Sequence, residues 1–233
     1  LYPRDMMAAS ALDDDAIRRS EDAWVDRLIE DAPGSGVTLL TARYDRAYID
    51  VNREPYELDA GMFSDALPAF AQSRTARVAA GLGSIARVVG EGQEIYRRKL
   101  TFEEARRRIE AVHTPYHAAL GRVLAESRRR WGRVVLLDWH SMPAAAAAEG
   151  ARLVNGERRG PDMVLGDRYG AACAPLVTAT VERELVAMGY HVERNRPYAG
   201  GWTTEHYGAP ARGAHALQVE INRALYLDEA TLE

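Results

Sequence analysis

Hydrophobic residues along the chain recur in short blocks, some spaced for strands and others for helices. Residues 134–137 are four consecutive apolar residues closed by Pro143, a pattern typical of a strand buried on both faces, and we expect it to be a central strand. Residues 215–223 alternate instead, which places Leu217, Val219 and Ile221 on one side and leaves the other side polar. Further strands are predicted at 162–166 and 190–194, with a helix at about 175–188.

The first half of the chain is less regular. We expect one amphipathic helix over 11–31 and short strands at 37–41 and 48–51. Glycines and prolines punctuate residues 55–100, which predicts a long irregular excursion over the mouth of a site. Thr101 and Glu104 form a capping-box pattern that opens a helix, and Pro115 should break or kink it before a second helical segment runs to about 130.

Alternation of strands and helices predicts an α/β fold: one domain over 1–233, with a mixed, mostly parallel sheet covered by helices on both faces. With 47% apolar and 27% charged residues and a net charge of −4, the composition gives no electrostatic footprint for nucleic acid and no span for a membrane. Cys173 is the only cysteine, which suits a reducing, cytoplasmic compartment, and we expect a buried structural thiol. The oligomeric state does not follow from the sequence.

Chemistry-bearing residues follow the apolar run at 134–137. Asp138 and His140 point to the same side of a strand, so the acid either orients the imidazole or binds beside it; a histidine satisfied by a neighbouring carboxylate is the structural alternative. Asp22 lies on the helix predicted over 11–31, where a solvated acidic face is the simpler interpretation. Glu220 lies in an apolar strand and should be partly desolvated.

Together, Asp22, His140 and Glu220 offer two ligand types and a spare carboxylate, the set that a hydrolytic zinc site requires. Spacing alone does not bring them together. A serine hydrolase is disfavoured because no GxSxG motif occurs, and residues 81–84 lack the spacing of a phosphate-binding loop. The glycine-rich residues 197–204 could bring backbone donors close to a ligand, and the arginine runs 106–108 and 128–130 suit solvated helix faces.

Five motifs in order give the chain a wider resemblance. They are Arg-Ala-Tyr-Ile-Asp-Val-Asn-Arg at 46–53, Tyr-His at 116–117, Leu-Asp-Trp-His-Ser-Met-Pro at 137–143, Leu-Gly-Asp-Arg at 165–168 and Leu-Gln-Val-Glu-Ile-Asn-Arg at 217–223. Over nearly its whole length the chain resembles the N-formylglutamate amidohydrolase family. That resemblance implies a zinc-carboxypeptidase-like fold with one Zn²⁺ held by two histidines and an acid.

Carried over by position, the resemblance makes Asp22 and His140 zinc ligands and Glu220 the general base. Asn52 and Arg53 match the pair that holds a substrate carboxylate. The candidates for a second carboxylate are Arg46, Arg74, Arg168 and Arg212. The family's first zinc ligand lies in a Pro-His-Ser/Ala-Gly motif shortly before a Tyr-Pro pair like that at 2–3, and we expect the domain to be truncated at both ends.

The activity that this resemblance implies is hydrolysis of a small-molecule N-acyl acidic amino acid, most simply N-formyl-L-glutamate to formate and glutamate in histidine breakdown. Zinc would lower the pKa of its water and polarise the formyl oxygen. Two alternatives stay open at this point. One is an amidase that acts on another N-acyl amino acid or a short peptide, and the other is a metal-free, non-catalytic ligand-binding protein of the same fold.

Overall fold

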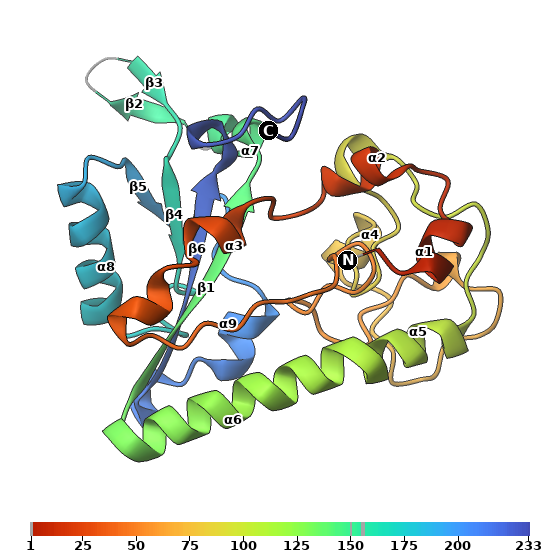
Figure 1. Ribbon diagram of the computed structural model, residues 1–233, viewed down its shortest axis with the longest axis horizontal. Coiled ribbons are helices and arrows are strands. Elements are labelled where there is room, and N and C mark those ends of the chain that lie inside the picture. Colours follow the sequence, from red (N-terminus) through yellow and green to blue (C-terminus); the bar gives the residue numbers. More distant parts are fainter. Residues whose placement is uncertain (1, 150, 155–156) are drawn as a thin grey trace. The chain divides into compact units, whose positions relative to one another are not determined.

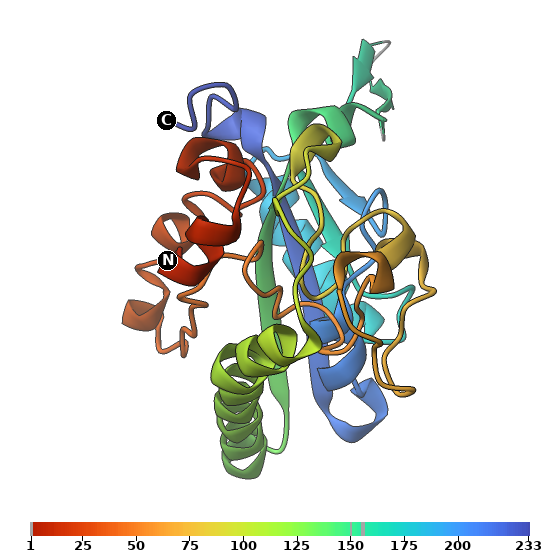
Figure 2. The ribbon, with the colours of Figure 1, turned by 90° about the vertical axis from the view of Figure 1, so that its right-hand side faces the viewer.

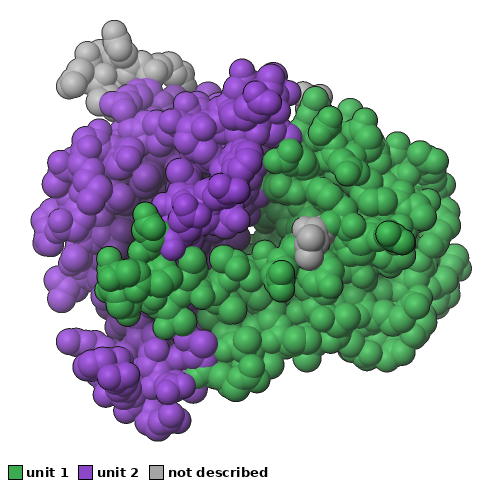
Figure 3. Space-filling view, in the orientation of Figure 1, with its two compact units in different colours: residues 1–21, 31–122 green, residues 22–30, 123–233 purple. Residues whose placement is uncertain are grey.

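The computed structural model describes residues 2–149, 151–154 and 157–233. The chain divides into two compact units, which Figure 3 distinguishes: unit 1 comprises residues 1–21 and 31–122, and unit 2 comprises residues 22–30 and 123–233. Each unit has its own hydrophobic core. The expectation of a single domain stays a prediction. Within the described ranges, no helix is both long and apolar enough to cross a membrane.

Unit 2 is built on a four-stranded sheet in the order β1-β6-β4-β5 (Figure 1). Its strands are β1 (Val134–Met142), β6 (Ala214–Asn222), β4 (Met163–Gly166) and β5 (Val192–Arg194). The pairs β1–β6 and β4–β5 are parallel, whereas β4–β6 is antiparallel, so the predicted mixed and mostly parallel sheet is confirmed. Figure 2 shows β1 and β6 side by side.

The expectation that β1 is a central strand is wrong, because among the described strands it pairs only with β6 and forms one edge of the sheet. The apolar run is correspondingly only partly covered: Val135 is 45% exposed and Leu137 is 36% exposed. A run of four apolar residues does not distinguish an edge strand from a central one, since it says nothing about neighbouring strands.

Helices cover both faces of this sheet, as predicted. On one face α8 (Pro175–Ala187) packs through Val177, Val181 and Leu185 against the apolar side of β6 and β4. On the other face α7 (Ala144–Glu149) packs through Ala147 against Met142 and Val164. The remaining elements of unit 2 are α3 (Val25–Leu28), β2 (Arg152–Val154), β3 (Glu157–Arg159), α9 (Trp202–Tyr207), η5 (Pro210–Arg212) and η6 (Arg223–Leu225).

Unit 1 holds its core together mostly with irregular chain. Its elements are α1 (Arg4–Ala9), α2 (Asp14–Arg18), η1 (Ala32–Ser35), η2 (Ala60–Met62), α4 (Ala76–Ala79), η3 (Gly90–Gly92) and α5 (Phe102–Arg108). Leu58, Ile85, Ile95 and Leu100 from the irregular stretch are fully buried. Residues 55–100 are therefore irregular, as predicted, but they supply much of a core instead of forming an excursion from one.

Three other elements in this half differ from expectation. The helix predicted over 11–31 is two short helices, α2 and α3, separated by a turn in which Trp24 has a left-handed φ of 63°. Residues 37–41 form no strand, and Val37 is 54% exposed. Residues 48–51 form turns and irregular chain instead of a strand, although Tyr48 and Ile49 are buried. Their apolar side chains fill a core without strand pairing, which periodicity alone does not reveal.

The capping box at Thr101 is confirmed: its hydroxyl accepts from the Glu104 backbone N–H, and the Glu104 carboxylate accepts from the Thr101 backbone N–H. Pro115 does not break the helix. A π-helical segment, Ile109–His113, follows α5, and α6 (Thr114–Trp131) continues from it. Proline lacks an N–H and clashes with the carbonyl four residues earlier, here within the π-helical segment, so we infer that the wider turn accommodates it.

Candidate active site

Two neighbouring strands of unit 2 bring four polar side chains onto one face of the sheet. In the parallel pair β1–β6, Asp138 is registered with Gln218 and His140 with Glu220. Registered residues on adjacent strands point to the same side, and alternate residues along each strand share a face. The opposite face of β6 is the apolar one that packs against α8. The alternation in the sequence of β6 thus places apolar residues on the face that packs against α8 and polar residues on the opposite face.

Asp22 joins this group from the turn before α3. Its Oδ2 lies 3.0 Å from Nδ1 of His140, and its Oδ1 accepts hydrogen bonds from the backbone N–H and the hydroxyl of Ser141 at 2.9 and 3.2 Å. The Ser141 hydroxyl in turn accepts a hydrogen bond from Nε of the buried Arg223. Asp22 is therefore fixed against the free edge of β1 and does not belong to a solvated helix face.

The imidazole of His140 lies between two carboxylates. Its Nε2 is 3.2 Å from Oδ2 of Asp138, on the side opposite the contact with Asp22. Burial by itself lowers the pKa of His140, but the charges and hydrogen bonds of Asp138 and Asp22 raise it well above the usual value. Asp138 therefore contacts the ring on this side and can orient it, and its role in the chemistry stays a prediction.

Glu220 is a buried carboxylate with a defined orientation. It is 6% exposed, and its Oε1 accepts a hydrogen bond of 2.7 Å from Nε2 of Gln218, two residues earlier on the same face. The expected desolvation is confirmed. Gln218 was not among the candidates, although the alternation of β6 already placed it beside Glu220.

The donors that Asp22 and His140 present fit part of a zinc site. A zinc ion takes imidazole nitrogen and carboxylate oxygen ligands at about 2.0–2.2 Å, so two such ligands lie roughly 3–3.5 Å apart, and Nδ1 and Oδ2 are 3.0 Å apart here. Oδ2 of Asp138, which lies 3.2 Å from the ring's other nitrogen, is buried. No group of three or more His, Cys, Asp or Glu side chains suited to a metal occurs within residues 2–149, 151–154 and 157–233.

The glycine-rich loop at 197–204 lies on the same face. A Cβ on Gly166, which is registered with Gln218, would come within 2.7 Å of the backbone of Ala199 and Gly200. Gly200 itself has a φ of 127°, which favours glycine. Backbone of this loop therefore packs directly on the face that carries Glu220, as a loop that supplies donors to a ligand would need.

Asn52 and Arg53 lie in a turn of unit 1 that hydrogen bonds and an ion pair hold in place. The Arg53 guanidinium donates from Nε to the carbonyl of Leu82 at 3.2 Å and from Nη1 to the carbonyl of Asn52 at 3.1 Å. Its Nε lies 3.8 Å from Oδ2 of Asp50. Burial alone would raise the pKa of Asp50, yet the charges of Arg46 and Arg53 lower it to about 2. Arg53 is thus held in one place by a carboxylate that stays ionised.

Three side chains from the helical stretch 102–131 contact backbone carbonyls of this turn. His117 contacts the carbonyl of Val51 at 2.8 Å, and His113 contacts the carbonyl of Arg53 at 3.0 Å. Arg108 donates to the carbonyl of Tyr48 and is 3% exposed. Its assignment to a solvated face is therefore wrong, because its guanidinium packs over the rings of Tyr48 and Tyr96 in the core. Neither histidine nor Arg108 was a candidate.

The other arginine candidates have partners of their own. Arg46 donates from Nε and Nη2 to Oδ2 of Asp50, at 3.3 and 3.0 Å. Arg168, with a left-handed φ of 53°, pairs with Glu205 at 3.1 Å. Arg212 is exposed in η5. Their assignment to a second carboxylate stays a prediction. Cys173 is fully buried and its pKa is raised by burial, which agrees with a structural thiol.

Known proteins resemble this chain over most of its length. A model of the N-formylglutamate amidohydrolase family matches residues 1–227. The chain is 31% identical over 211 residues to the N-formylglutamate deformylase of Pseudomonas aeruginosa, a match that covers 89% of this chain and 71% of that protein. It is 38% identical to the crystal structure of N-formylglutamate amidohydrolase from Ralstonia eutropha JMP134, with a TM-score of 0.91 over 100% of this chain and 81% of that one. A protein of Agrobacterium tumefaciens shares the fold, with a TM-score of 0.56 and 19% identity over 95% of this chain and 76% of its own.

The two carboxylates beside His140 generate a prediction for the metal-free protein. Asp22→Asn removes one negative charge but keeps an oxygen for the Ser141 N–H, so the pKa of His140 should fall toward its usual value of 6.5. An NMR titration of the ring protons measures this shift, with His215 of the same unit as internal reference. A raised folded-state pKa stabilises the fold below the unfolded value and loses that contribution as pH rises through the folded one. The wild type should therefore lose more stability than the variant over that window, and an unchanged His140 pKa contradicts the contact.

Proposed function

As this chain belongs to the N-formylglutamate amidohydrolase family, we propose that it hydrolyses the amide bond of N-formyl-L-glutamate to give formate and L-glutamate. The observation that carries the proposal is the register of β1 with β6, which sets the imidazole of His140 beside the buried carboxylate of Glu220. An imidazole nitrogen that can bind a metal, next to a buried carboxylate that can act as general base, is the arrangement that activation of a water molecule needs.

We further propose that the enzyme is zinc-dependent, with Asp22 and His140 as two of the protein ligands. Support comes from their 3.0 Å separation and from Asp138, which contacts the far nitrogen of the ring as carboxylates do behind zinc-bound histidines. The resemblance to the family implies a histidine as the third protein ligand. A bound zinc ion would polarise the formyl oxygen and lower the pKa of a water molecule.

In this proposal Glu220 moves the proton. Its carboxylate accepts a proton from the attacking water and later gives it to the leaving nitrogen, so that the C–N bond breaks with release of the free amine of glutamate. Gln218 holds one carboxylate oxygen by a 2.7 Å hydrogen bond, which limits rotation of the group. Asp138 and Asp22 hold the imidazole of His140 from both sides, so the ring does not turn away during the reaction.

Arg53 is proposed to bind a substrate carboxylate. Nε and Nη1 of its guanidinium are occupied by backbone carbonyls, and no acceptor for Nη2 is found in the described part of the chain. The side chain is 16% exposed, so a ligand can reach it while most of the group is shielded from water. Guanidinium also keeps its proton where an ammonium group can lose it.

The first test of this function is Glu220→Gln. The variant keeps an oxygen for the hydrogen bond from Gln218, so its fold and zinc content should match the wild type, while turnover of N-formyl-L-glutamate falls by ~10²-fold or more because general acid–base assistance is lost. Formate release and metal content are measured on the same samples. Glu184→Gln, on the exposed side of α8, is the matched control and should be neutral.

A Glu220→Gln protein with near-normal turnover would remove Glu220 from the mechanism. Wild-type protein that releases no formate, but cleaves another N-acyl amino acid or a short peptide, would replace the proposed substrate. Binding without any turnover, in protein free of metal, would support a ligand-binding protein instead.

Arg53→Lys should be harmful even though it conserves charge. Lysine cannot donate to the carbonyls of Leu82 and Asn52 and also present two parallel hydrogen bonds to a carboxylate. We expect a loss in kcat/KM of roughly 2–4 kcal/mol, as for a broken charged pair in a secluded site. Melting temperature is measured on the same sample: a lower melting temperature with unchanged kcat/KM per folded molecule would make Arg53 a structural partner of Asp50.

A further inference from the structure

Unit 1 concentrates positive charge around Arg53. Burial lowers the pKa of Arg53, Asp50 raises it, and the nearby charges of Arg46 and Arg77 lower it further. Two carboxylates, Asp50 and Glu57, form ion pairs with these three guanidinium groups, and burial together with the nearby carboxylate of Glu57 raises the pKa of Glu54.

The backbone of Leu82 ties two of the three arginines together. Its carbonyl accepts the hydrogen bond from Nε of Arg53, and its N–H donates to the carbonyl of Arg77 at 2.8 Å. The turn approaches closely because residue 83 is glycine: a Cβ there would lie 2.4 Å from the carbonyl oxygen of Glu57. The Gly-Leu-Gly-Ser run at 81–84 thus joins the chain segments that carry the two arginines.

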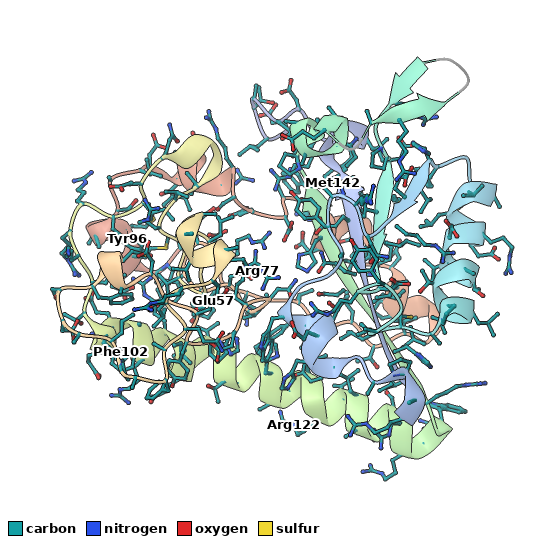
Figure 4. All side chains as sticks on the ribbon, turned by 180° about the vertical axis from the view of Figure 1, so that it is seen from behind. Glu57, Arg77, Tyr96, Phe102, Arg122 and Met142 are labelled. Atoms are coloured by element: carbon teal, nitrogen blue, oxygen red, sulfur yellow. The ribbon has the colours of Figure 1, made fainter. Side chains whose placement is uncertain are left out.

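Glu57 is a buried carboxylate that pairs with Arg77, and this pair distinguishes Arg77 from the other arginines. This glutamate is 3% exposed, its Oε1 accepts a hydrogen bond of 2.5 Å from the Thr75 hydroxyl, and its buried Oε2 has no hydrogen-bond partner. Oε2 lies 3.9 Å from Nη1 of Arg77, and Figure 4 labels the two side by side. A buried carboxylate at this distance attracts the guanidinium without using its N–H groups in a direct hydrogen bond.

Arg77 consequently keeps donors available for a ligand. Its side chain is 39% exposed, and it donates no side-chain hydrogen bond to any described residue. Arg46 differs, because two of its nitrogens already donate to Asp50. Arg74, three residues earlier, is exposed and has no described charged partner, so it lacks the buried anchor that Arg77 has.

We propose that Arg77 binds the second carboxylate of a dicarboxylic substrate and that Glu57 is the residue that positions it. The inference rests on the proposed function, in which Arg53 holds the other carboxylate. It makes the enzyme selective for an acidic side chain: a neutral amide of the same shape presents no charge to Arg77, which then gains nothing in return for its lost hydration.

Selectivity between isosteric substrates tests this directly. We would measure kcat/KM for N-formyl-L-glutamate and N-formyl-L-glutamine with the wild type, Arg77→Gln and the matched control Arg107→Gln. Arg77→Gln should lose ~10–100-fold on formylglutamate, mostly through KM, and less than about 3-fold on formylglutamine, since a hydrogen bond to a charged group is lost only with the former. Arg107→Gln removes the same charge from the exposed side of α5 in the same unit and should change neither value.

Glu57→Gln keeps the oxygen that accepts from Thr75 but removes the negative charge beside Arg77. It should reduce the preference for formylglutamate by ~3–10-fold without lowering kcat for formylglutamine, because Arg77 loses its anchor and not its charge. A fold defect would instead lower both substrates together and depress the melting temperature.

Binding decides the inference even if turnover fails. Calorimetric titration with glutarate and butyrate should show weaker glutarate binding in Arg77→Gln and unchanged butyrate binding. Equal weakening of both acids, no change in either, or an unchanged selectivity ratio would overturn the role of Arg77. Absence of formate release by the wild type, with the glutarate result as expected, would reject the proposed reaction and leave the carboxylate site supported.

Discussion

The parallel pairing of β1 with β6 is the constraint on which the candidate active site depends. It sets His140 level with Glu220 and Asp138 level with Gln218, all on one face. A slip of one residue would turn either strand's polar side chains into the apolar layer under α8. Two further contacts of β6 fix this register. The face of β6 opposite Glu220 is buried against α8, and the edge of β6 that does not pair with β1 pairs with β4. The positions of the polar groups thus follow from the burial of Leu217 and Val219.

Among the described strands β1 pairs only with β6, and this gives Asp22 its place. A central strand would use both backbone edges in sheet hydrogen bonds, whereas the free edge of β1 leaves the N–H of Ser141 for the Asp22 carboxylate. The same carboxylate then reaches His140 with its second oxygen. One carboxylate therefore contacts both the edge of β1 and the imidazole of His140, and Arg223 donates a hydrogen bond to the hydroxyl of Ser141.

The sequence was informative where one local pattern determined one structure. The alternation in β6, the capping box at Thr101 and the helix α8 were all predicted, because periodicity and side-chain caps act within a few residues. It was misleading where tertiary contacts decide: the apolar residues at 48–51 fill a core as turns, and Asp22 lies in a break between helices. In the site, alternation placed Glu220 and also implied Gln218, but no local pattern linked Glu57 to Arg77, which are twenty residues apart in sequence and joined by an ion pair in unit 1.

The place where zinc binds in the active protein tests the proposed ligands Asp22 and His140 most directly. Anomalous diffraction at the zinc absorption edge, from crystals of active protein, locates the ion without reference to any assumed mechanism. We predict one strong peak bonded to Nδ1 of His140 and to a carboxylate oxygen of Asp22, two atoms that lie 3.0 Å apart in this structure. A zinc peak in active protein that contacts neither side chain would contradict it.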